Sequence, residues 1–238
     1  MNIMNKPILA ATMANGYRGR SAAGQVLAKC LARDYAQPDP IILALPRGGV
    51  SVAREIAESL HAPLEVFVVR KIGLPDRSGI SIGAIATGGV QLMDDALITA
   101  ERIPPGTVLS QIAAETVELN RRERLYRGDR PPRSVENRAV VLIDDGMVTG
   151  YTMRVAVLAL LQLNPAHVAI AIPVGAPIPC TLLEGLVDQL ICPLRPEPFH
   201  AVGLSYDHFP ALTDENVRSD MAAAEEAFQR WQQNESAG

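Results

Sequence analysis

The chain has 238 residues, of which 48% are hydrophobic and 20% charged, and its net charge is −4. This composition is sufficient for a sizeable apolar core and excludes an intrinsically disordered chain. The weak negative charge gives no reason to expect nucleic acid or an anionic membrane as the main partner. No apolar run approaches the ~20 residues of a membrane span. Cys30, Cys180 and Cys192 are scattered, so we expect reduced thiols, as in a cytoplasmic protein.

Short apolar runs alternate with helical segments along most of the chain. Strands are predicted at residues 41–45, 64–69, 140–143 and 168–172, with helices at 51–60 and 152–163. Continuous apolar strands separated by helices are typical of a parallel sheet that is covered on both faces. We therefore predict an α/β fold with a parallel central sheet and flanking helices. In this prediction residues 1–238 form a single domain with a core at about 17–216.

Three segments depart from this alternation. Residues 81–93 predict a hairpin of two short strands around Thr87, Gly88 and Gly89. Long helices are predicted at 107–126 and, near the end of the chain, at about 219–232. Residues 121–138 hold seven arginines against three acidic residues. This basic segment is either a solvated helix end with its linker or part of an anion-binding rim.

The most informative stretch is residues 140–152, in which a buried strand ends at two adjacent carboxylates, Asp144 and Asp145. Open α/β sheets bind their ligands at the carboxyl ends of the strands. The glycines and threonines that follow lead straight into a helix, and they offer backbone N–H groups, hydroxyls and the positive end of a helix dipole to a phosphate group. Carboxylates beside a phosphate repel it unless they bind hydroxyls or a magnesium ion. Ribose with a 5′-phosphate satisfies both halves of this pattern.

These thirteen residues resemble the phosphoribosyl-pyrophosphate (PRPP) signature of the type I phosphoribosyltransferases. Residues 45–50, Leu-Pro-Arg-Gly-Gly-Val, resemble that family's pyrophosphate loop, which in many members contains a non-proline cis peptide. Residues 69–73 and the segment after them resemble its mobile catalytic loop, expected over 71–81. Residues 17–20, Tyr-Arg-Gly-Arg, are similar to a marker of an uncharacterised branch of the family. The resemblance covers about residues 17–216 and implies the family's parallel sheet, a small hood and a hairpin-containing flexible loop.

The resemblance implies a role for each part of these motifs. Asp144 and Asp145 hold the ribose hydroxyls, partly through Mg²⁺. The loop that cradles the 5′-phosphate consists of Gly146, Met147, Val148, Thr149, Gly150, Tyr151 and Thr152. The pyrophosphate is received by Arg47 with the backbone of Gly48 and Gly49, and Lys71 helps to stabilise it. Closure of the 71–81 loop then excludes water from the site.

The implied activity is the Mg²⁺-dependent transfer of the 5-phosphoribosyl group from PRPP to a nitrogen acceptor, with release of pyrophosphate. The alternative is a binding protein of the same fold that senses PRPP without turnover and regulates an RNA or protein partner. The basic segment at 121–138 is the feature that serves this alternative. A homodimer is expected on family analogy.

The sequence departs from the family pattern within the phosphate loop. In the 6-oxopurine enzymes a third acid, three residues after the second one, faces the base, and here Val148 stands at that position. A valine cannot exchange a proton, so we expect an acceptor other than a 6-oxopurine unless Glu197 supplies the acid. Met147 and Tyr151 are bulkier than the residues that this loop usually carries.

The region after Cys192 is rich in proline and aromatic residues and corresponds to the hood. Phe199 and Tyr206 either stack an acceptor base there, or pack in the core or in a dimer contact. We expect His200 and His208, in the same stretch, to have surface or packing roles.

Residues 79–83 match the Gly-x-Ser-x-Gly pattern of a nucleophile elbow, which makes a serine hydrolase using Ser81 a remote alternative. An elbow needs a strand before its serine and a helix after it. The residues before Ser81 are polar and rich in proline and glycine, and residues 84–86 favour a strand. We therefore expect a loop that enters a hairpin at this position.

Overall fold

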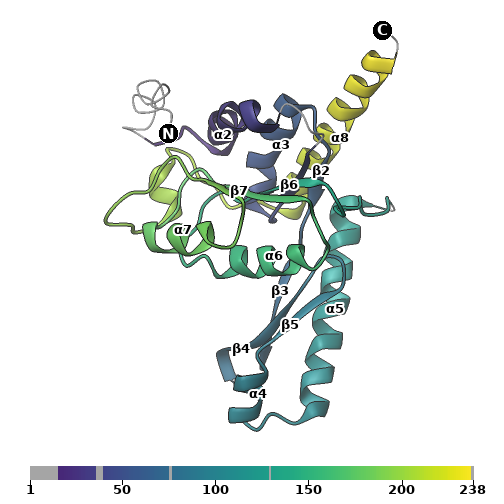
Figure 1. Ribbon diagram of the computed structural model, residues 1–238, viewed down its shortest axis with the longest axis vertical. Coiled ribbons are helices and arrows are strands. Elements are labelled where there is room, and N and C mark those ends of the chain that lie inside the picture. Colours follow the sequence, from purple (N-terminus) through teal and green to yellow (C-terminus); the bar gives the residue numbers. More distant parts are fainter. Residues whose placement is uncertain (1–15, 36–39, 75–76, 129, 237–238) are drawn as a thin grey trace.

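The computed structural model describes residues 16–35, 40–74, 77–128 and 130–236. It consists of a body, built on a five-stranded parallel sheet, and an arm of residues 69–127, built on a three-stranded antiparallel sheet (Figure 1). The predicted α/β fold with a parallel central sheet is confirmed. Among the helices of the described residues, none has both the length and the apolar character that a membrane crossing requires.

The sheet of the body has the strand order β2-β1-β6-β7-β8. Its strands are β1 (Ile41–Ala44), β2 (Leu64–Val66), β6 (Ala139–Ile143), β7 (His167–Ala171) and β8 (Gln189–Ile191). Alternate side chains enter different hydrophobic cores, so that Ile42 and Ala44 pack on one face of the sheet and Ile41 and Leu43 on the other. Because both faces are covered, the central strands are continuous apolar runs.

Helices cover the two faces of this sheet. Those packed on the face of Ile42 are α2 (Arg20–Tyr35), α3 (Gly48–Leu60) and α8 (Asp214–Ser236). Those on the other face are α6 (Tyr151–Leu161) and α7 (Pro177–Glu184). The hood carries a short 3₁₀ helix, η1 (Val202–Ser205).

The arm projects from the body, and its long helix runs beside its small sheet (Figure 1). Its elements are β3 (Val69–Leu74), β4 (Arg77–Ala86), β5 (Val90–Met93), α4 (Asp95–Ala100) and α5 (Pro105–Arg127). The hairpin predicted at 81–93 is present as β4 and β5. Gly88 and Gly89 form its turn with φ values of 87° and 76°, which glycine adopts without strain.

The bounds of most predicted elements differ from the structure by up to three residues, and two elements need a larger correction. A single strand over 64–69 is wrong, because the chain leaves the parallel sheet after Val66 and enters the arm at Val69. Val68 marks the transition, since its N–H donates to the Thr87 side chain at 2.8 Å rather than to a strand of the body. The final helix begins at Asp214, five residues before its predicted start.

Candidate functional site

The acid pair lies at the carboxyl end of β6, where all but the first residue of the strand is buried. The Asp145 N–H donates to Asp144 Oδ1 at 2.8 Å, which ties the two residues together. Burial and the nearby charge of Asp145 raise the pKa of Asp144 well above its ordinary value. The strand therefore places two interacting carboxyl groups at the edge of the sheet where ligands of such folds bind.

The Pro-Arg-Gly-Gly loop that follows β1 lies directly on this acid pair. A Cβ atom on Gly48 would overlap the Asp145 carboxylate, and one on Gly49 would come within 2.6 Å of the Ile143 carbonyl oxygen. Only glycine allows the backbone to approach so closely. Two motifs that are almost 100 residues apart in the sequence therefore form one surface.

The loop at residues 146–152 stands beside the acid pair, at the N-terminus of α6. Gly150 has a φ of 71°, and α6 begins directly after it, so the first N–H groups of the helix are presented at this loop. The side chains of Val148 and Thr149 are exposed there. Met147 is buried, so its bulk lies beneath the loop rather than in the cradle. This arrangement suits an anion.

Lys71 brings the arm to the same loop. Its Nζ lies 4.4 Å from the centre of the Tyr151 ring, in a cation–π contact. Two predicted site residues are thus neighbours, although one belongs to the arm and the other to the body. Residues 75–76 of the predicted 71–81 loop lie outside the described residues, and the segments on either side of them belong to β3 and β4.

Arg47, at the start of α3, is exposed and turns toward the start of α8. Its Nε donates to Asp214 Oδ1 at 2.9 Å, and its Nη1 donates to the Leu212 carbonyl oxygen at 3.0 Å. The peptide bond that precedes Arg47 is cis. Asp214 belongs to none of the sequence motifs, and no local pattern could join two residues so far apart in the chain.

Arg20 is a second residue of the site that the sequence analysis did not single out. Its Nε lies 2.8 Å from Asp145 Oδ2, and its guanidinium stacks 3.8 Å from the centre of the Phe209 ring. Both partners of this ion pair are largely buried, with side-chain exposures of 10% and 16%. The only sequence signal was its place in the Tyr-Arg-Gly-Arg marker at residues 17–20. Arg20 supplies positive charge to the acid pair from α2.

The hood touches the acid pair through an aromatic cluster. Tyr206 donates its hydroxyl to the Asp145 carbonyl oxygen at 2.6 Å, and its ring packs against Tyr17 and Phe209 at centroid distances of 5.5 and 4.8 Å. Burial raises the pKa of Tyr206 above its ordinary value. Phe199 is half-buried in the same cluster. Tyr206 therefore fixes the backbone of the acid pair, in keeping with the packing alternative for these aromatic residues.

A family model described as a phosphoribosyl transferase domain matches residues 18–193. The chain belongs to the phosphoribosyl transferase domain family. Over 213 residues it is 34% identical to the Mycobacterium tuberculosis H37Rv protein named "Putative phosphoribosyl transferase Rv0571c", an alignment that covers 88% of this chain and 47% of that protein. The chain thus spans about half the length of the curated relatives that it matches.

A solved structure gives a comparison of the whole fold. The protein TT1426 from Thermus thermophilus shares 36% identity with this phosphoribosyl transferase domain and a TM-score of 0.74. The match covers 87% of this chain and 97% of that chain. The family model itself ends at residue 193, so most of the hood and all of α8 lie beyond it.

Ser81 of this phosphoribosyl transferase domain lies inside β4, neither on a nucleophile elbow nor in the loop that was expected there. The strand pairs antiparallel with β3 and β5 and continues to Ala86, so no helix follows the serine. The Ser81 hydroxyl donates to the Gly83 carbonyl oxygen at 2.8 Å. Because an elbow needs a strand, a sharp turn and a helix, the serine hydrolase alternative is wrong.

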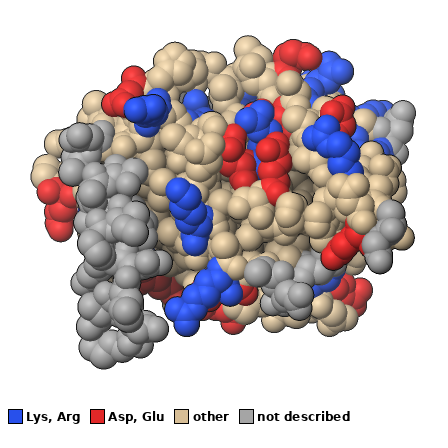
Figure 2. All heavy atoms as spheres, turned by 90° about the horizontal axis from the view of Figure 1, so that it is seen from above, with Lys and Arg blue, Asp and Glu red and all other residues tan. Residues whose placement is uncertain are grey.

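The basic segment at 121–138 is tied to the rest of the protein by ion pairs. Its pairs join Arg121 and Arg122 to Glu118, Arg127 to Glu65, and Arg130 and Arg133 to Glu225. The pairs with Glu118 lie within α5, whereas Arg127 attaches the end of α5 to β2, and Arg130 and Arg133 attach the linker after it to α8. On the face drawn in Figure 2, basic side chains are likewise interspersed with acidic ones. These pairs neutralise five of the seven arginines within the chain, which favours the helix end with its linker over an anion-binding rim.

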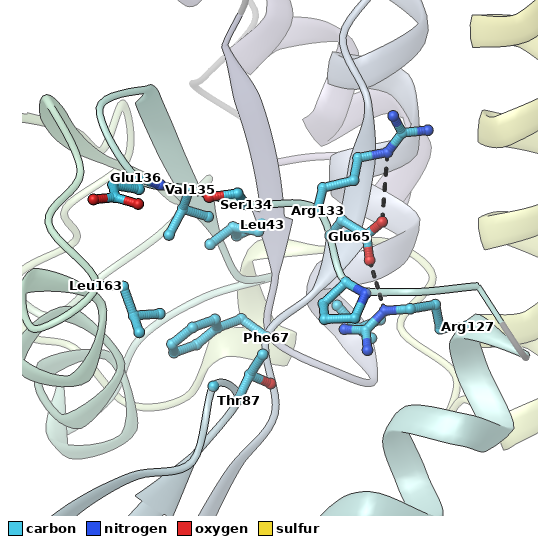
Figure 3. A pocket seen from close by; sticks show the side chains of 13 residues that line it. Leu43, Glu65, Phe67, Thr87, Arg127, Arg133, Ser134, Val135, Glu136 and Leu163 are labelled. Atoms are coloured by element: carbon cyan, nitrogen blue, oxygen red, sulfur yellow. Dashed lines mark hydrogen bonds and ion pairs between the residues drawn. The ribbon is translucent and has the colours of Figure 1, made fainter.

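A cavity of about 300 Å³ lies beside this linker, near the turn of the hairpin (Figure 3). Leu43, Phe67 and Leu163 contribute apolar lining, and at one side Glu65 binds the Nε of Arg127 at 2.9 Å. The residues predicted for the PRPP site do not line this cavity. It is therefore separate from the acid pair and marks the junction between body and arm.

Proposed function

We propose that this chain is a Mg²⁺-dependent phosphoribosyltransferase, which moves the 5-phosphoribosyl group from PRPP to a nitrogen acceptor and releases pyrophosphate. The proposal rests mainly on one observation: the backbone of Gly48 and Gly49 lies so close to the acid pair that a side chain at either glycine would overlap it. A loop for pyrophosphate, carboxylates for ribose hydroxyls and a helix N-terminus for the 5′-phosphate then meet at one edge of the sheet. The family and the name of the Mycobacterium tuberculosis relative support the same activity.

The proposed reaction exchanges one bond at the anomeric carbon of the ribose. The bond to the pyrophosphate oxygen breaks, its electron pair leaves with the pyrophosphate, and the acceptor nitrogen bonds to the carbon. Positive charge then builds on the sugar and negative charge on the leaving group. Asp144 and Asp145 stabilise the cationic ring, while Arg47 and Lys71 stabilise the pyrophosphate.

The acid pair fits a magnesium ion. Asp144 and Asp145 offer adjacent carboxylate oxygens, which are the ligands that Mg²⁺ prefers, and substrate phosphates commonly complete its coordination. Burial and, after it, the charge of Asp145 raise the pKa of Asp144, and a bound cation would favour the ionised form of both carboxyl groups. When bound, the ion supplies positive charge to the leaving pyrophosphate.

The acceptor in this proposal is not a 6-oxopurine. Val148 is 51% exposed on the phosphate loop, at the position where the 6-oxopurine enzymes carry an acid. General acid–base help of that kind is typically worth about 10²–10⁴-fold in rate. A panel of bases tested with the wild type and Val148→Asp checks this point. Turnover of hypoxanthine or guanine by the wild type at rates ordinary for an enzyme would refute it.

The transferase activity is tested by product analysis. The protein is incubated with PRPP, Mg²⁺ and a mixed pool of nucleobases and amines, and new phosphoribosyl products are sought by mass spectrometry. We expect one product that requires both PRPP and Mg²⁺, and none from the Asp144→Asn/Asp145→Asn variant. Binding of PRPP without product from any acceptor would favour the sensing alternative.

The proposed partners are PRPP, a small nitrogen acceptor and a second copy of the chain. The homodimer follows from family analogy, and light scattering tests it directly, since a monomeric mass would remove it. The alternative of a PRPP-sensing protein that regulates an RNA or protein partner was based on the basic segment at 121–138. This support is weakened, because arginines of that segment are paired with carboxylates of the same chain.

A further inference from the structure

Arg47 is held by residues that lie outside its own sequence motif. Asp214, the first residue of α8, accepts its Nε–H at 2.9 Å, and the Leu212 carbonyl accepts its Nη1–H at 3.0 Å. Tyr126, near the end of α5, donates its hydroxyl to the same Asp214 oxygen at 2.7 Å. The guanidinium is thus fixed where the start of α3, the end of α5 and the start of α8 meet.

The start of α8 is itself firmly placed. Thr213 and Asn216 cap the helix reciprocally, since the Asn216 N–H donates to the Thr213 hydroxyl at 3.2 Å and Asn216 Oδ1 accepts the Thr213 N–H at 2.9 Å. One turn further on, Asp220 binds Arg54 of α3 at 3.0 Å. Asp214 therefore stands on a helix whose first turns are attached to the body.

These contacts leave Arg47 able to bind an anion. A guanidinium has five N–H donors in one plane, and Asp214 and Leu212 take two of them. The hydrogen bond from Tyr126, with the charge of Arg47, lowers the pKa of Asp214 below its ordinary value. Asp214 is therefore an ionised anchor that two partners satisfy. The Tyr126 side chain also interacts with the Arg47 guanidinium, so at least two of its donors are left for a ligand.

We propose that Asp214 and Tyr126 are positioning residues, which orient Arg47 to receive the pyrophosphate of PRPP. This inference rests on the proposed function, which assigns the pyrophosphate to Arg47. An exposed arginine loses side-chain entropy when it binds an anion, and an arginine that is already anchored loses less. Removal of the anchor should weaken pyrophosphate binding about three- to tenfold. If Asp214 instead competed with the ligand for Arg47, its removal would strengthen binding.

The direct test is the affinity of the full chain for inorganic pyrophosphate with Mg²⁺, measured by titration calorimetry. We expect Asp214→Asn to weaken binding about three- to tenfold and Tyr126→Phe to weaken it less. Glu215→Gln is the matched control, because it removes the same charge from the same turn of α8 while its partner is Arg218. Equal or tighter binding by Asp214→Asn would overturn the inference.

A double-mutant cycle with Arg47→Ala separates positioning from a general effect on the fold. Arg47→Ala should weaken pyrophosphate binding about tenfold or more, and Asp214→Asn should add nothing in that background. A loss through poor folding would appear equally in both backgrounds and would contradict the positioning role. If Arg47→Ala leaves the affinity unchanged, the pyrophosphate assignment in the proposed function fails and the inference fails with it. If only Asp214→Asn has no effect, the inference alone fails.

Discussion

The body and the arm of this molecule are built in different ways. Six of the 11 residues of α6 in the body are buried, against three of the 23 residues of α5 in the arm. All four residues of β1 are buried, whereas Ile72 is the one buried residue of β3. The acid pair and its glycine loop thus stand on a closely packed core. Lys71 reaches Tyr151 of the phosphate loop from β3, most of whose residues are only half-buried, which suits a part of the site that closes over a substrate.

The largest difference between the two regions should appear in their stability. Leu142→Ala in β6 removes a fully buried side chain and should cost about 2–5 kcal/mol of unfolding free energy. Val117→Ala in α5, where the side chain is 70% exposed, should change it by less than about 0.5 kcal/mol. Urea denaturation measures both, and similar losses in the two variants would contradict the comparison.

The junction between body and arm should be the next most sensitive point. Arg127 and Glu65 form a buried ion pair, with side-chain exposures of 6% and 4%. Among the described residues, Arg127→Met leaves the Glu65 charge with the 3.6 Å contact of Arg133 alone, so we expect a loss of about 3 kcal/mol. The double variant Arg127→Met/Glu65→Leu should recover most of it, because no buried charge is then left alone. A double variant as unstable as the single one would show that packing, not charge, holds the junction.

Lys71→Ala should separate catalysis from stability in the arm. The side chain is exposed, so its loss should change the unfolding free energy by less than about 0.5 kcal/mol. Removal of a charge that faces the leaving group should lower kcat about 10–100-fold. Steady-state kinetics on the product identified above measure this, with the exposed arm variant Gln91→Ala as control. Unchanged turnover in Lys71→Ala would take the arm out of the proposed mechanism.

The smallest effect concerns the attachment of the basic linker to α8. Burial raises the pKa of Glu225, but the hydrogen bond from Gln229 and the charges of Arg130 and Arg133 lower it below its ordinary value. Because the pKa of Glu225 is lower in the folded state than in the unfolded chain, where it is about 4.3, the ionised group stabilises the fold at a pH above this value. The stabilisation is lost as the pH falls through the folded-state pKa. Glu225→Gln should therefore cost less than about 1 kcal/mol at neutral pH. Calorimetry should show that the difference in stability between the wild type and Glu225→Gln disappears as the pH falls below about 4.3. A difference that does not change with pH would contradict this explanation.

The comparison also explains which parts of the fold were predictable. The strands ending at Ala44 and Ile143 are buried on both faces, so their sequences are apolar without interruption and were predicted within one residue at each end. The helix α2 was not predicted, since its stretch mixes polar and small residues with a weak apolar pattern. The strand β8 has only three residues at the edge of the sheet, which is too short for a periodic signal.

The residues of the site also fall into a predictable group, which lies in local motifs, and a group that the sequence does not reveal. Asp144, Asp145 and Gly48 belong to local motifs, and such motifs are visible in a sequence because a loop after a strand must carry its own glycines and carboxylates. Arg20 and Asp214 reach the site from helices 125 and 167 residues away from their partners. Their contacts depend on how the helices pack on the sheet, and no local pattern contains that information.

The most direct test of the account is the binding of PRPP with Mg²⁺ to the wild type and to Asp144→Asn/Asp145→Asn, measured by titration calorimetry. Relief of the repulsion between the two carboxylates should stabilise the variant, whereas loss of the largely buried Arg20–Asp145 ion pair should destabilise it, so we expect a lower melting temperature. Thermal unfolding then checks that the variant is folded at the temperature of the titration. We predict saturable binding by the wild type and no measurable binding by the variant. Equal affinity for PRPP in the two proteins would contradict the assignment of the acid pair.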